Sequence, residues 1–73
     1  MTTRDEAEAV RQRHESRMVS TPGVTGVDVR EDEPGDAVIV VYAADEADLP
    51  DWLTAQTLDG VPLRLQRRRF DPL

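Results

Sequence analysis

The sequence predicts an α+β fold: an N-terminal helix packed on a three-stranded mixed sheet, in the order helix, strand, strand, short helix, strand. Three observations predict it: a capped helical pattern over residues 4–19, a Pro-Gly turn between two valine-rich segments, and an alternating segment after Gly60. At 73 residues the chain is long enough for one small α/β domain, residues 1–73.

The N-terminal helix is expected from about Arg4 to Val19. Thr3 and Glu6 have the spacing of a capping box, in which each side chain accepts or approaches the other's backbone amide. The helix has to stop before Pro22-Gly23. Its apolar stripe is spaced three, four and four, and consists of Ala7, Val10, His14 and Met18.

Two strands are expected next, joined by a hairpin. Residues 25–30 alternate between apolar and polar side chains, which indicates a strand with one wet face. Residues 33–36 place Pro and Gly as a type II turn requires. The run of residues 37–42 does not alternate, which predicts a central strand that is buried on both faces, with Val40 in the core.

The remaining chain is expected to form a short helix and a last strand. Leu49-Pro50-Asp51 suits a helix start, and residues 52–58 allow two turns before Gly60 ends them. Alternation over residues 61–65 predicts a strand, and a bulge or strand end is expected near Arg67, where the alternation breaks. We expect this short helix near the sheet face opposite the first helix; if it does not cover that face, the face is an interface.

The composition excludes several classes of site and location. There is no cysteine, which excludes disulfides, zinc–thiolate sites and thiol catalysis, and His14 is the single histidine. We therefore expect no metal and no cofactor. The longest apolar run, Val38 to Ala44, is far shorter than the ~18 residues of a membrane span. The acidic start of the chain does not resemble a secretory signal, so a cytoplasmic location is expected.

Charge is unevenly distributed. Residues 1–60 carry fourteen acidic residues against five arginines, whereas residues 61–73 carry four arginines against one aspartate. A body this acidic should repel nucleic acid and anionic lipid, so neither is expected as a partner. The basic cluster has three possible uses: pairing with the protein's own acidic loops, docking to an acidic protein or a second copy, or nucleic-acid binding. It consists of Arg64, Arg67, Arg68 and Arg69.

No residue pattern indicates catalysis. A general base needs an orienting partner and a proton within reach, and neither Glu15 nor Ser16 can face His14 on a helix. We expect His14 to lie at the margin between helix and sheet with one hydrogen bond. The acidic hairpin tip, residues 28–36, does not match the spacing of a calcium loop. The sequence thus predicts no enzyme and no small-molecule substrate.

Candidate partner-binding residues are Trp52 and the four arginines of the basic cluster. Tryptophan is favoured at interfaces because it buries a large area with few rotatable bonds. The alternative for Trp52 is a structural lid over the sheet. The arginines can pair bidentately with carboxylates of a neighbouring chain.

One further pattern is a resemblance. The chain contains Pro22-Gly23-Val24, then Gly26-Val27, then Leu49-Pro50, then Gly60-Val61-Pro62-Leu63. It resembles a small bacterial α/β domain that occurs alone and beside trypsin-like peptidase domains. Because no catalytic triad accompanies the pattern, the resemblance implies an accessory or regulatory module rather than a peptidase.

Two functional hypotheses follow. The first is a non-enzymatic protein-interaction or regulatory module that associates with itself, because a core this small often needs a partner. The alternative is a small acidic inhibitor or antitoxin-like partner that docks on a basic protein surface.

Overall fold

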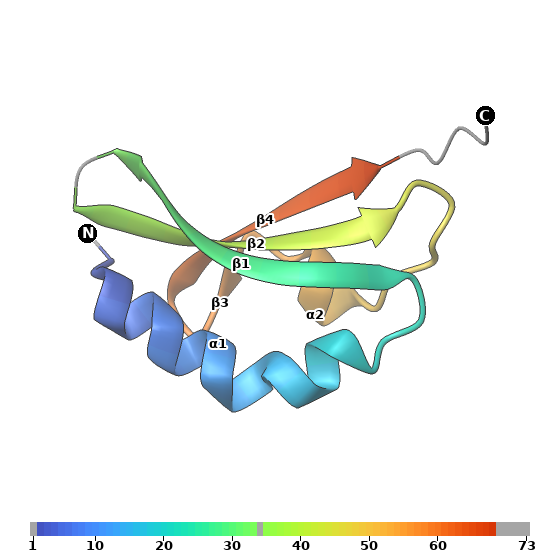
Figure 1. The fold of residues 1–73 in the computed structure, drawn as a ribbon, viewed down its shortest axis with the longest axis horizontal. Coiled ribbons are helices and arrows are strands. Elements are labelled where there is room, and N and C mark those ends of the chain that lie inside the picture. The colour runs from blue at the N-terminus through green and yellow to red at the C-terminus, as the bar shows by residue number, and fades with distance from the viewer. Residues whose placement is uncertain (1, 34, 69–73) are drawn as a thin grey trace.

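A computed structural model describes residues 2–33 and 35–68. Its elements are α1 (Arg4–Val19), β1 (Val24–Glu33), β2 (Asp36–Ala44), α2 (Asp51–Thr54), β3 (Thr57–Leu58) and β4 (Val61–Arg68). The strands form one mixed sheet in the order β1-β2-β4-β3 (Figure 1). The α+β class is confirmed, but the sheet has four strands rather than the expected three.

Helix α1 has the bounds expected from its capping signals. The Glu6 amide donates to the Thr3 side chain at 3.2 Å, which is the forward half of the capping box. At the other end the Ser20 amide donates to the Ser16 carbonyl at 3.1 Å. Acidic side chains lie in the first turn and Arg17 in the last, as the helix dipole favours.

The hairpin and the central strand are also confirmed. Strands β1 and β2 pair antiparallel from Val24–Ala43 to Glu33–Asp36, and β2 pairs parallel with β4. Gly35 has φ = +84°, which fits the third position of a type II turn; Pro34 of that turn lies outside the described residues. Val40 is 2% exposed, as expected of a central strand.

The segment between β2 and β4 differs from the expectation. Helix α2 is a single turn that ends at Thr54, because Ala55 is extended (φ −67°, ψ 159°). The chain then forms β3 and turns back into β4 through Asp59 and Gly60, both at positive φ (+49° and +82°). Two consecutive positive φ values are those of a type I′ hairpin turn. Gly60 is thus a hairpin residue and not a helix stop.

The predicted position of the short helix, near the sheet face opposite the first helix, is also wrong. Both α1 and α2 lie on the same side of the sheet, below it in Figure 1. Leu53 of α2 is fully buried in the same core cluster as Met18 of α1 and Ile39 of β2. Burial of apolar surface against one shared core decides this placement. Among the described residues, no helix lies over the opposite side of the sheet, which we call the open face.

Two buried valines lie in the middle of the open face. Val38 and Val40 alternate with the core residue Ile39 and are only 3% and 2% exposed. Val38 lies beside Arg30 of β1. Val40 lies between Asp28 of β1 and Arg64 of β4. The aliphatic parts of long polar side chains can shield apolar neighbours in this way. The open face is thus polar at its surface with a buried valine strip beneath. Within the part of the chain that the structure describes, no helix is long and apolar enough to cross a membrane.

Candidate interaction surface

The expected partner-binding residues do not form one surface. Arg64 alternates with Leu63 on β4, so it lies on the open face while Leu63 faces the core. Trp52 belongs to α2, on the other side of the sheet. Arg68 is the last residue of β4, and Arg69 lies outside the described residues.

Arg64 forms an ion pair with Asp32, across the open face from β4 to β1. Asp32 lies in the irregular register between Glu31 and Glu33. Both side chains remain partly exposed, so the pair contributes little to stability. Pairing with the protein's own acidic residues, one of the three uses considered for the basic cluster, is thus seen for Arg64.

Arg67 is bound to the backbone rather than free at a bulge. The β2–β4 register is regular through Ala44–Arg68, so the strand ends at Arg68 without the bulge considered near Arg67. One Arg67 guanidinium nitrogen, Nη1, donates to the carbonyl oxygens of Ala44, Asp45 and Ala47, at 3.4, 3.0 and 2.8 Å. Because Nη1 carries two hydrogens, the three acceptors require one hydrogen to be shared, which fits the longer contact to Ala44. Arg67 thereby holds the loop that follows β2.

Trp52 serves as a structural contact between the two helices. Its ring packs against the core cluster, and the guanidinium carbon of Arg17 lies 3.7 Å from the ring centroid. This is a cation–π geometry, which adds to the attachment of α1 to α2. The lid interpretation of Trp52 fits this position.

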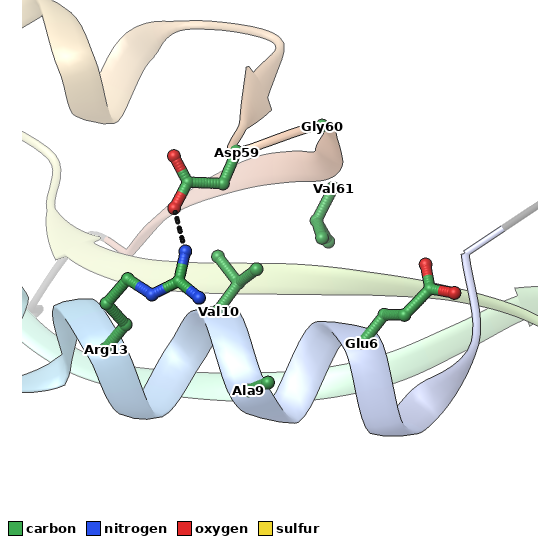
Figure 2. A pocket seen from close by; sticks show the side chains of 7 residues that line it. All are labelled: Glu6, Ala9, Val10, Arg13, Asp59, Gly60 and Val61. Atoms are coloured by element: carbon green, nitrogen blue, oxygen red, sulfur yellow. Dashed lines mark hydrogen bonds and ion pairs between the residues drawn. The ribbon is translucent and has the colours of Figure 1, made fainter.

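His14 lies at the margin between helix and sheet, as expected. Its Nε2 is 2.9 Å from Oδ2 of Asp59, and the Arg13 guanidinium donates to the same oxygen at 3.1 Å. The Arg13–Asp59 pair lies at the rim of a hollow of about 300 Å³ between α1 and the β3–β4 turn. Figure 2 shows this pair and the other side chains that line the hollow. The lining residues are Glu6, Ala9, Val10, Arg13, Asp59, Gly60 and Val61.

Two neighbouring side chains of α1, Arg13 and His14, bind one carboxylate oxygen of Asp59, and we call this arrangement the Asp59 clamp. The hydrogen bond from His14, followed by that from Arg13, holds the pKa of the Asp59 carboxyl below its ordinary value of 3.8. Asp59 thereby ties α1 to the β3–β4 turn. Among the described residues no group of three or more His, Cys, Asp or Glu side chains could hold a metal ion.

The lowered pKa of Asp59 predicts a pH dependence of stability. A carboxyl whose pKa is lower in the folded state stabilises the fold above its unfolded pKa, and this contribution is lost as pH falls through the folded pKa. Asp59→Asn keeps a residue that tolerates positive φ but removes the charge. In urea melts we expect the parent to be the more stable protein at about pH 5, and the difference to shrink steadily below pH 3.8. A difference that stays constant down to about pH 2.5 would contradict the clamp.

The residues that sequence reasoning missed lie along the outer edge of β1. Asp28 and Arg30 are both exposed on the open face, and their charged groups are 3.7 Å apart. The Asp28 carboxylate also accepts the amide of Val29 at 2.8 Å. The sequence shows an acidic and a basic residue on either side of one valine in a predicted strand, whereas the topology shows that this strand ends the sheet.

Comparison with protein-family models, with curated proteins and with solved structures finds no match to this chain. The function is therefore argued from the residues alone.

Proposed function

We propose that this protein is a non-enzymatic interaction or regulatory module of the cytoplasm that associates with itself. The observation that carries the proposal is the one-sided architecture. Both helices cover one side of the sheet, so within the described ranges no helix lies over the open face and no strand pairs with the outer edge of β1. An unpaired edge strand presents backbone donors and acceptors to another chain. The accessory role implied by the resemblance to a peptidase-associated domain agrees with such a module.

The alternative, an acidic inhibitor or antitoxin-like protein, is supported by the loop that Arg67 holds. Asp45, Glu46 and Asp48 are exposed there while the backbone between them is fixed by the guanidinium. Carboxylates on a fixed backbone lose little entropy on meeting a basic partner, and they raise the rate of encounter. In that case the chain is a monomer until its partner is present.

Oligomeric mass separates the two. In size-exclusion chromatography with multi-angle light scattering, at tens of micromolar, we expect a particle of about twice the chain mass of 8.2 kDa. The mass should fall toward that of one chain on dilution, because an interface on so small a domain is limited in area. A monomer at every concentration, together with a cooperative melt, contradicts self-association and favours the inhibitor.

A further inference from the structure

The ladder between β1 and β2 decides which backbone groups of β1 point toward its outer edge. The Ala37 amide donates to the Thr2 carbonyl at 2.7 Å, so it is not donated to β1. Hydrogen-bonded and non-bonded pairs alternate along an antiparallel ladder. Ala37–Glu31, Ile39–Val29 and Val41–Val27 are therefore non-bonded pairs. The backbone groups of Val27, Val29 and Glu31 thus point outward, and the bond from the Val29 amide to the Asp28 side chain agrees with this.

We propose that a second copy of the chain adds to this edge, with its β1 antiparallel to the first and Val29 opposite Val29 of the second copy. The inference rests on the proposed self-association and names its surface. The pairing joins the two sheets into one, as in strand addition by peptides. Asp28 of each chain then faces Arg30 of the other, in the close non-bonded positions of the new ladder.

Charge selects this register over its neighbours. Facing residues of an antiparallel pair lie on the same side of the sheet, so the second copy can shift only in steps that keep this parity. One step in one direction places Asp28 opposite Asp28 of the second copy. One step in the other direction places Arg30 opposite Arg30 of the second copy. Like charges directly opposite are unfavourable, whereas pairing about Val29 opposes unlike charges twice.

Association replaces two interactions of the single chain, both of which involve the Asp28 carboxylate. In the single chain the Asp28 carboxylate accepts the Val29 amide and lies 3.7 Å from Arg30 on its own strand. In the pair the Val29 amide donates to the Val29 carbonyl of the second copy, which releases the Asp28 carboxylate for the facing arginine. No buried donor or acceptor is left unpaired by the exchange. Both charged side chains are more than half exposed, so they are free to make it.

A charge exchange tests the register. Asp28→Arg and Arg30→Asp each oppose like charges in the proposed pair, and we expect each variant alone to dimerise at least tenfold more weakly than the parent. A one-to-one mixture of the two variants restores both unlike pairs, and we expect a heterodimer within about threefold of the parent affinity. The double variant D28R/R30D should dimerise with itself for the same reason.

The controls change the same net charge elsewhere. Asp48→Arg and Arg4→Asp alter exposed residues of the loop after β2 and of α1, and should dimerise as the parent does. Masses are measured by light scattering, and far-ultraviolet circular dichroism shows that each variant is folded. If the parent dimerises and the single variants dimerise equally well, the β1 register is wrong while self-association stands. If the parent is a monomer, the β1 register and the proposed self-association are both wrong. Dimerisation of Asp28→Ala would then show that the Asp28 side chain, by accepting the Val29 amide, prevents strand addition.

Discussion

Replacing Val40 by aspartate is expected to unfold the protein at ambient temperature. Val40 is 2% exposed in the central strand, where it lies beside Asp28 of β1 and Arg64 of β4. A charge placed there without a partner costs on the order of 3–5 kcal/mol. Asp28, the facing residue on β1, adds repulsion, and Arg64, the facing residue on β4, is already paired with Asp32. Because a core of this size seldom supplies more than about 3–5 kcal/mol in total, little stability would remain.

The matched control is Val19→Asp, which introduces the same side chain at an exposed valine. Val19 is 54% exposed at the end of α1, so the carboxylate stays in water. An acidic group near a helix C-terminus costs only about 0.3–1 kcal/mol. Circular dichroism melts of both variants provide the measurement. A Val40→Asp melt as cooperative and as high as that of the control would show that the open face is wetter than the structure indicates.

The features of the fold that were predictable are those encoded by neighbouring residues. The capping pair of Thr3 and Glu6 sets the start of α1, and Pro22-Gly23 sets its end. The uninterrupted β-branched run predicted a strand buried on both sides, and β2 is the strand paired on both edges. In each case the signal lies within a few residues of the structure that it determines.

The features that were missed depend on distant contacts or on a turn signal assigned to the wrong element. Asp59-Gly60 is a strong type I′ hairpin signal, but after an amphipathic stretch it was interpreted as a helix stop. Strand β3 is two residues long and exists only because β4 pairs with it. The side of the sheet that α2 covers was predicted wrongly for the same reason, because Leu53 joins the core cluster of Met18 only in the folded chain.

The candidate site shows the same division. The unlike charges on either side of Val29 are visible in the sequence, but their significance depends on β1 being an edge strand, which the topology decides. Arg67 is one of the candidate partner-binding residues of the sequence analysis. It binds carbonyl oxygens at residues 44, 45 and 47 instead, and backbone acceptors carry no sequence signature.

The loop before β1 packs closely against the loop after β2 at Gly23, the last residue before β1. Its φ is +93°, a backbone conformation that residues with a Cβ adopt at a cost of about 1–2 kcal/mol. A Cβ added there would lie 2.3 Å from the Cβ of Ala47, in the loop held by Arg67. The Gly23 carbonyl also accepts the Ala44 amide at 2.8 Å, and the Ala47 carbonyl accepts from Arg67. Neither loop can therefore move away from the other without losing a hydrogen bond.

Gly23→Ala is therefore expected to destabilise the fold more than Gly60→Ala, although both glycines have a similar positive φ. Gly60 (φ +82°) has nothing within 4 Å of an added Cβ, so its variant measures the backbone cost alone. Overpacking adds about 1–3 kcal/mol at Gly23. Removing the opposing methyl group in Gly23→Ala/Ala47→Gly should recover much of that excess, and the double-mutant cycle isolates it. Urea melts give the free energies of unfolding of the parent, Gly23→Ala, Ala47→Gly and the double variant, which form the cycle, and of Gly60→Ala. Equal losses for the two glycine variants, or no recovery in the double variant, would mean that the loops after α1 and β2 are not packed as closely as described.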